Sequence, residues 1–322
     1  MSSEASISLE AVDCPLGCRR DDEFVLTGGD RLHRLAGEFA VNRCRTCGLM
    51  RTDPRPTLEA MRRYYPDEYG PHQVVSVSPS STTSRPRWRR ALGSLMWRLA
   101  DSKAESLPRM TPGRLLEVGC GSGSFLSRMA LEGWDVEGIE VSETAAARAR
   151  ALGHTVHVGN LADIAISGKR FDVVAGWMVL EHLHDPLAAL RRLRSWIRPG
   201  GWLVLSLPDA GALGFKLLRG AWYDLDLPRH LYHFDRRTLR DLLEKCGWRV
   251  TRFVTQRSIL SLVASAGYLL DDLGLAAGVA GRLKSAPDRP GRLPLLLFPA
   301  AFALSLVGQT GRVVVWAHQS RD

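Results

Sequence analysis

Residues 114–143 read RLLEVGCGSGSFLSRMALEGWDVEGIEVSE and carry the strongest structural signal in the chain. The apolar run at 115–118 fits a buried parallel strand, and a glycine-rich turn follows it at 119–123. Apolar residues then recur at helical spacing before a second apolar run, 134–139, which fits another strand. A strand, a glycine turn, a helix and a strand in this order predict an α/β fold with a Rossmann-like parallel sheet.

The turn and the two strand ends indicate which ligand the sheet binds. Glu140 closes the second strand 21 residues after Gly119, where an acidic residue can bond both ribose hydroxyls of a nucleoside. A dinucleotide-binding loop spaces its second and third glycines three apart, but Gly121 and Gly123 are two apart. Glu117 adds a carboxylate that would repel a pyrophosphate but suits a ligand with an ammonium and a sulfonium charge. We therefore predict S-adenosylmethionine as the cofactor.

Further strands are expected to complete the sheet. The third ends near residue 158, where Asn160 could bond the adenine edge and Leu161 could pack on its ring. Asp185 and Pro186 form a capped start for a helix after the fourth strand. The later strands are expected at residues 171–175, 202–207, 248–255 and 312–317.

Five motifs within residues 113–257 resemble class I S-adenosylmethionine-dependent methyltransferases. They are LLEVGCGSG, VEGIEVSE, FDVVAGWMVLEHLHDP, IRPGGWLVLSLPD and DLPRHLYHF. The nearest resemblance is to a small-molecule branch similar to ubiquinone-biosynthesis O-methyltransferases. It implies a seven-stranded methyltransferase sheet with helices on both faces and an antiparallel last strand.

The same resemblance implies a set of cofactor contacts. Asn160 stands where the family more often has an acidic residue, and its amide oxygen can still accept from the adenine amino group. The implied cofactor-binding residues are Glu117, Gly119, Cys120, Gly121, Gly123, Glu140, Val141, Asn160, Leu161 and Met178.

Two cysteine pairs near the N-terminus predict a structural Zn²⁺ site. Cys14 and Cys18 form one pair, and Cys44 and Cys47 form the other after 25 intervening residues. Zinc takes four soft ligands in tetrahedral geometry, and closely spaced pairs can supply them. So short a segment has too little apolar sequence for its own core, so the ion would stabilise its fold. A redox dithiol, unliganded cysteines, and His33 in place of one cysteine are the alternatives.

Composition and charge divide the chain into three expected parts. Residues 1–72 form a zinc-ribbon-like module, similar to a leader often fused to such methyltransferases. Residues 73–112 form a linker and a basic connecting helix, and residues 113–322 form the methyltransferase domain. The net charge is +9, but five arginines lie within residues 85–98, so the positive charge is local. The ordinary globular composition excludes fibrous and wholly disordered classes.

Three histidines are candidate catalytic residues. A sulfonium methyl is already a strong electrophile, so a protein mainly has to align the acceptor and exclude water. A hydroxyl acceptor would benefit from a general base. His182 follows the fourth strand, and His230 and His233 lie on a loop after the fifth, so all three can reach the same cleft. Arg229 could bind an anionic substrate or pair with a nearby aspartate.

An apolar insertion, about residues 258–311, separates the last two strands. Residues 293–311 carry no charge, but Pro294 and Pro299 are expected to limit any helix there to two or three turns. A lid over the acceptor site, a homodimer interface and contact with an anionic membrane are the alternatives. A spanning helix is disfavoured because both flanking strands belong to one sheet.

The predicted function is methyl transfer to a small-molecule acceptor: a sugar, a lipid-linked glycan or a secondary metabolite. An RNA methyltransferase is the first alternative, although nucleic acid is disfavoured because the positive charge is clustered. A non-catalytic cofactor-binding interaction protein is the second. The first twenty residues lack an apolar run, so we expect a cytoplasmic protein, with peripheral contact at the inner membrane face left open.

Overall fold

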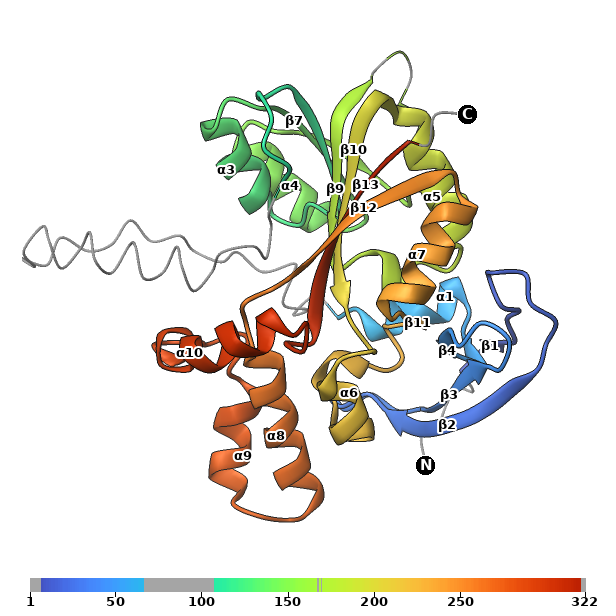
Figure 1. The fold of residues 1–322 in the computed structure, drawn as a ribbon, viewed down its shortest axis with the longest axis vertical. Coiled ribbons are helices and arrows are strands. Elements are labelled where there is room, and N and C mark those ends of the chain that lie inside the picture. The colour runs from blue at the N-terminus through green and yellow to red at the C-terminus, as the bar shows by residue number, and fades with distance from the viewer. Residues whose placement is uncertain (1–6, 67–106, 167, 169, 320–322) are drawn as a thin grey trace, which may run out of the picture.

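The computed structural model describes residues 7–66, 107–166, 168 and 170–319, and a seven-stranded sheet forms its centre (Figure 1). The strand order is β12-β13-β10-β9-β6-β7-β8, and β13 pairs antiparallel with both β10 and β12. This is the predicted α/β class with an antiparallel last strand. The strands are β6 (Arg114–Val118), β7 (Asp135–Glu140), β8 (Thr155–Val158), β9 (Phe171–Trp177), β10 (Ile197–Pro208), β12 (Trp248–Thr255) and β13 (Arg312–Gln319).

Helices cover both faces of the sheet. In Figure 1, α3 (Ser124–Leu131) and α4 (Glu143–Ala151) lie on one side, and α5 (Pro186–Trp196) and α7 (Arg236–Lys245) lie on the other. The Asp185 side chain caps α5, with Pro186 in its first turn, as predicted. The Asp235 side chain caps α7 in a capping box with Thr238.

The strands are apolar on both faces because helices bury both faces. Leu115 belongs to the apolar cluster on one side of the sheet, and its neighbour Leu116 belongs to the cluster on the other side. Val173 and Val174 divide in the same way, since successive side chains of a strand point to opposite faces. All four are fully buried. This burial explains why the strands read as continuous apolar runs in the sequence.

The N-terminal segment forms a small sheet that includes a strand from much later in the chain. Its order is β11-β4-β3-β2, and β11 (Tyr232–His233) pairs antiparallel with β4. The loop that carries His230 and His233 is therefore hydrogen-bonded to this segment. The other N-terminal elements are β1 (Leu9–Glu10), β2 (Asp22–Gly29), β3 (Glu38–Cys44), β4 (Met50–Thr52), β5 (Arg55–Pro56), α1 (Leu58–Met61) and η1 (Arg62–Tyr64). The expected linker and basic helix fall mainly on residues 67–106, outside the described residues.

The insertion folds into α8 (Leu260–Asp272), α9 (Ala277–Lys284) and α10 (Leu293–Leu306). The expectation that prolines break the last segment is wrong, because α10 runs through Pro299 for 14 residues. Pro294 sits in the first turn, where its missing N–H has no helical partner, so only Pro299 removes a helical hydrogen bond. None of the described helices is long and apolar enough to cross a membrane.

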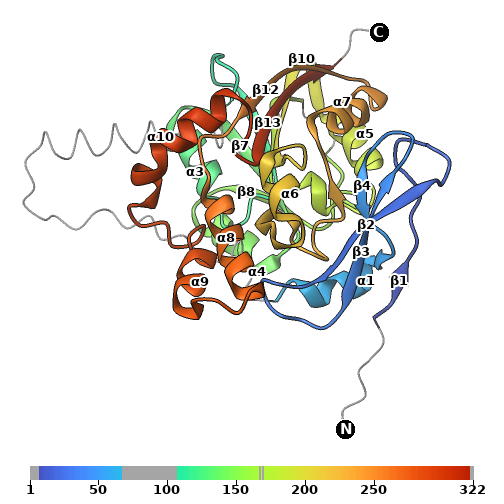
Figure 2. The same cartoon turned by 60° about the horizontal axis from the view of Figure 1, so that its bottom comes forward.

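Short elements complete the end of the sheet toward which β10 points. They are η3 (Leu180–His182), α6 (Leu213–Leu218), η4 (Arg219–Ala221) and η5 (Tyr223–Leu225). Figures 1 and 2 show that α6, α8 and the N-terminal segment gather at this end. Ligands of open α/β sheets bind outside the carboxyl ends of the parallel strands, so this is the end where the site is expected.

Candidate functional site

The glycine turn after β6 has a backbone that other residues would strain. Gly119 and Gly123 have φ angles of +71° and +84°, in the region that favours glycine. A Cβ at Gly119 would lie 2.8 Å from Val179 Cγ2, and one at Gly123 would lie 2.9 Å from Ala149 Cβ. Contacts this short exclude larger residues at both positions, so the turn requires glycine there.

Two predicted carboxylates flank this turn. Glu117 lies on β6 and Glu140 ends β7, the neighbouring strand, and both are buried. One oxygen of Glu140 accepts a 2.8 Å hydrogen bond from Gly121 N, and the other accepts a 2.9 Å bond from Ser142 N. Glu140 is therefore held against the turn, with its carboxylate at the predicted nucleoside position.

The other predicted cofactor residues follow the neighbouring strands. Asn160 and Leu161 follow β8, where Leu161 is buried and the exposed Asn160 amide donates to Asp163. Val141 follows β7 and is exposed. Met178 follows β9 with a φ of +56°, which is strained for a residue other than glycine. These positions surround the carboxyl ends of four adjacent strands.

Cys120 differs from the other residues of this set. Its side chain is buried, and a Cβ at Gly138 would lie only 2.5 Å from its sulfur. Burial raises the pKa of the Cys120 thiol above its usual value, so the thiol stays protonated. Only the backbone of Cys120 is suited to contact a ligand in the turn.

His182 and His230 lie together, as their sequence positions suggested. Their ring centroids are 4.6 Å apart, with the planes at 76°. His182 Nδ1 lies 3.1 Å from the carbonyl oxygen of Arg229, and His230 Nδ1 lies 2.8 Å from that of Asp224. A carbonyl oxygen only accepts, so we assign the proton of each ring to Nδ1. Each Nε2 is then left with a lone pair.

The environment keeps this histidine pair uncharged. Burial, and to a smaller extent the neighbouring His230, lowers the pKa of His182 to about 3. Burial also lowers the pKa of His230. At neutral pH both rings can accept a proton, although a depressed pKa makes each a weaker base than a solvated histidine.

Glu181 adds a buried carboxyl beside the pair. It is fully buried, and neither carboxyl oxygen has a hydrogen-bond partner among the described residues. Burial raises the pKa of Glu181 to about 8, so the group is mostly protonated at neutral pH. Glu181, His182 and His230 offer one ligand atom each within 4.8 Å of one another, a spacing that could hold a divalent cation.

His233 occupies a different environment. It is buried on β11, and its Nε2 lies 3.4 Å from the Thr52 hydroxyl. Burial lowers the pKa of His233 to about 3. Of the three predicted histidines, His182 and His230 thus form the pair, while His233 contacts the N-terminal sheet.

Arg229 lies in a buried ion-pair network. Its side chain is fully buried, and its guanidinium bonds both Asp226 and Asp30 at 2.6 Å. It also donates to the carbonyl oxygen of Tyr64 at 3.2 Å. The pairing with Asp226 was among the predicted alternatives, whereas Asp30 comes from the N-terminal segment. This network joins that segment to the loop carrying His230.

Sequence reasoning missed two N-terminal side chains at the histidine pair. The Tyr65 hydroxyl lies 2.9 Å from His182 Nδ1, and the Thr52 hydroxyl donates a 2.8 Å hydrogen bond to the backbone oxygen of His230. More than a hundred residues separate the partners in each contact. No local pattern in the sequence indicates either contact, because both depend on how the two sheets pack.

The four N-terminal cysteines converge as predicted. One sulfur from each of Cys14, Cys18, Cys44 and Cys47 lies within 4.8 Å of the others, and the Cys14 and Cys47 sulfurs are 3.5 Å apart. Tetrahedral zinc with Zn–S bonds of about 2.3 Å needs sulfurs roughly 3.8 Å apart, so the donor set fits the ion. His33 is not part of this group.

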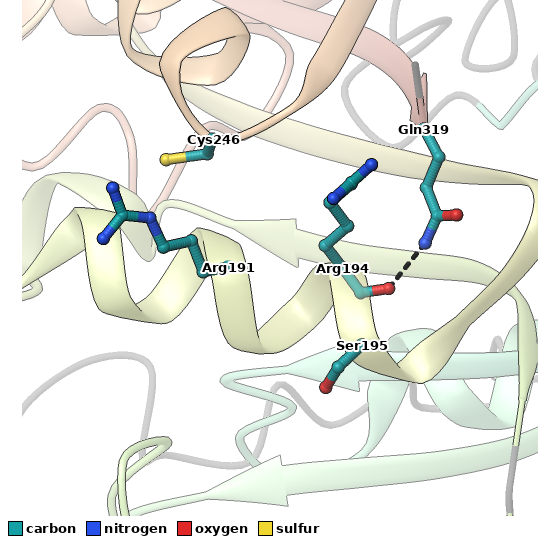
Figure 3. Close-up of a pocket in the computed structure, with 5 residues that line it drawn as sticks. All are labelled: Arg191, Arg194, Ser195, Cys246 and Gln319. Carbon is teal, nitrogen blue, oxygen red and sulfur yellow. Dashed lines mark hydrogen bonds between the residues drawn. The ribbon is translucent and has the colours of Figure 1, made fainter. Parts of the chain in front are cut away.

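Two hollows lie outside the cofactor turn. The first, of about 290 Å³, is bordered by α5 and the ends of α7 and β13, where Gln319 donates to the carbonyl oxygen of Arg194 (Figure 3). It contains none of the predicted site residues. The second, of about 340 Å³, lies between β2, η5 and α8 and includes Asp226. At its rim Arg31 lies 4.6 Å from the Tyr268 ring centroid and pairs with Asp272.

Comparison with known proteins matches this chain to a protein family. The family model described as "Methyltransferase domain" matches residues 89–252, about half of the chain. A ubiquinone biosynthesis O-methyltransferase of Cereibacter sphaeroides is 35% identical over 146 residues, which are 42% of this chain and 59% of that protein. Another, of Leptothrix cholodnii, is 31% identical over 179 residues, 49% of this chain and 76% of that protein.

The chain therefore spans 59% of the length of the first of these relatives. Among solved structures, an S-adenosylmethionine-dependent methyltransferase from Mesorhizobium loti is 17% identical, with a TM-score of 0.45. That match covers 70% of this chain and 96% of the other.

Proposed function

Because this chain belongs to the methyltransferase domain family, we propose that it transfers a methyl group from S-adenosylmethionine to a small-molecule acceptor. The observation that carries the proposal is the pair of carboxylates, Glu117 and Glu140, at the ends of adjacent strands beside the glycine turn. The relatives named as ubiquinone biosynthesis O-methyltransferases favour a small acceptor.

The residues around the turn fit the proposed cofactor. Glu140 would accept from the ribose hydroxyls, and Glu117 would face the ammonium group. Leu161 would pack on the adenine, and the backbone near Met178 would border its edge. When bound, S-adenosylmethionine supplies an electrophilic methyl group, so the chain needs no nucleophile of its own.

The histidine pair is proposed to receive the acceptor's proton. Nδ1 of each ring is held by a backbone carbonyl, which leaves Nε2 available to accept a proton from a hydroxyl. Burial keeps both rings neutral at neutral pH. His233, bonded near Thr52, is the weaker candidate for this role.

Replacing Glu140 with alanine is expected to weaken S-adenosylmethionine binding roughly 100-fold, because two hydrogen bonds to a charged group are lost. Isothermal titration calorimetry measures the effect. Glu143→Ala is the matched control: Glu143 lies in the first turn of α4 and its exposed side chain pairs with Arg150. Equal affinity of the Glu140→Ala and wild-type proteins would remove Glu140 from the cofactor site.

Alanine substitution of the residue that acts as base is expected to lower kcat about 100-fold, the usual contribution of general-base catalysis. His182→Ala and His230→Ala are compared with His318→Ala, a histidine on β13 beside Trp202. Because the pKa of His182 is about 3, loss of activity through its protonation should begin only below pH 5. Full activity of both single variants and of the double variant would exclude His182 and His230 as the base.

The acceptor class can be tested with labelled S-adenosylmethionine and a cell extract separated into lipid, RNA, protein and small-molecule fractions. Label in the small-molecule or lipid fraction supports the proposal. Label in the RNA fraction would favour the RNA alternative, and no transfer to any fraction would favour a non-catalytic cofactor-binding protein.

A further inference from the structure

Helix α10 exposes an apolar surface of a kind that folded proteins rarely leave in water. The helix has no charged residue, and Ala301 is its only buried residue. Its exposed positions fall on one side of the helix and are all apolar: residues 296, 299, 300, 302, 303 and 306. The surface helix of a globular protein normally presents polar residues on this outward side. The Leu296 and Leu306 side chains are 74% and 72% exposed.

Positive charge borders this apolar side. Arg282, Arg289 and Arg292 precede α10 and are exposed, and none of them forms an ion pair within the described part of the chain. Lys284 pairs with Asp271, and Asp288 is the only acidic residue between residues 273 and 311. An anionic bilayer has negatively charged headgroups above apolar acyl chains. Arginines beside an exposed apolar helix complement both layers.

We propose that α10 and the basic segment 282–292 form a docking surface for an anionic phospholipid bilayer. The 14 residues of α10 extend about 21 Å, which is too short to span the roughly 30 Å hydrocarbon core. The helix therefore lies in the interface, with its outward side in the acyl region and the arginines at the headgroups.

The neighbouring hairpin supports the same orientation. The exposed Leu273 and Leu275 lie between α8 and α9, and the exposed Val279 lies in the first turn of α9. In both Figure 1 and Figure 2, α9 and α10 lie on the same side of the molecule. A broad, flat partner such as a bilayer suits two exposed helices on one side of the molecule. The charge complementarity favours lipid over a second copy, since a second copy would bring the same arginines together.

The docking surface also suggests where the methyl acceptor comes from. Helix α8 lies at the end of the sheet toward which β10 points, and it also borders the 340 Å³ cavity that includes Asp226. A docked molecule would hold this end of the sheet near the bilayer, where a lipid-linked acceptor resides. Only this last step rests on the proposed function, because the docking surface itself needs no methyl transfer.

Flotation of the full chain with phosphatidylcholine vesicles, with and without phosphatidylglycerol, tests the docking surface. The wild-type protein should float with the anionic vesicles, and Leu296→Glu/Leu306→Glu should reduce the partition coefficient about 100-fold. Arg282→Gln/Arg289→Gln/Arg292→Gln should reduce partition into anionic vesicles about 100-fold and abolish the preference for them. The matched control is Leu131→Glu, on a 91% exposed leucine at the end of α3, which should float like the wild type.

Calorimetry with S-adenosylmethionine on the same preparations separates the two proposals. Flotation without cofactor binding would contradict the proposed function alone. Absence of the wild-type protein from the anionic vesicles would overturn the docking surface, as would equal flotation of the double leucine variant. A wild-type dimer in light scattering that the leucine variant dissociates, without flotation, would assign this side of α10 to a second copy.

Discussion

The Cys44→Ser variant is expected to lose stoichiometric zinc and most of the ordered structure of residues 7–66. The four sulfurs come from two cysteine pairs that are distant in sequence. Cys44 is the last residue of β3, which lies between β4 and β2 in the small sheet. Zinc binding at such sites contributes about 10–16 kcal/mol of apparent free energy, so loss of one ligand removes a large part of the stability of this segment. Metal analysis and limited proteolysis measure the two effects.

The consequence should reach the histidine pair. β4 pairs with β11, and Thr52 at the end of β4 bonds the backbone of His230. Unfolding of the small sheet removes both contacts, so we expect methyl transfer to fall together with the zinc content. Cys246→Ser is the matched control, because Cys246 is a buried cysteine that is not one of the four clustered residues. A Cys44→Ser protein with full zinc content and wild-type protease resistance would contradict the structural site.

Replacing Arg229 with methionine is expected to lower the free energy of unfolding by about 3–5 kcal/mol. The substitution keeps an unbranched apolar chain of similar length but leaves Asp30 and Asp226 without their common cation. A buried carboxylate without a partner carries its full desolvation cost. Urea unfolding followed by circular dichroism measures the change. Arg43→Met, which breaks a half-exposed pair with Glu23, should cost about 1 kcal/mol or less.

The stability lost on replacing Arg229 should depend on pH in a defined direction. Burial alone would raise the pKa of Asp226, but Arg229 holds it below the usual value. The wild-type protein therefore gains stability from this group above the unfolded pKa, about 4, and loses it as pH falls through the folded pKa. Without Arg229 burial dominates and the pKa of Asp226 rises, so the difference between the two proteins should shrink in acid. A difference that stays constant down to pH 3 would exclude Asp226 as its origin.

Local patterns predicted the large sheet and the cofactor turn because each signal lies within a few residues. The Asp185 cap, the Pro186 start and the apolar strand runs all act over one or two turns, and each occurs where the sequence placed it. Pro299 shows the limit of the same reasoning. A proline in a helix costs one hydrogen bond, but α10 continues past it, so the local penalty did not determine the outcome.

The sequence alone determined the class of fold, the glycine turn after β6 and the convergence of four cysteines, because these follow from periodicity, spacing and ligand chemistry. Only the tertiary structure decided that the N-terminal segment helps to build the histidine site. Tyr65 reaches His182, and Asp30 reaches Arg229 across 199 residues of sequence. Such contacts depend on the packing of two sheets, and no spacing rule within one segment encodes it. Only the structure showed which side of α10 is exposed. The sequence of an apolar helix does not indicate whether it packs in a core or contacts a membrane.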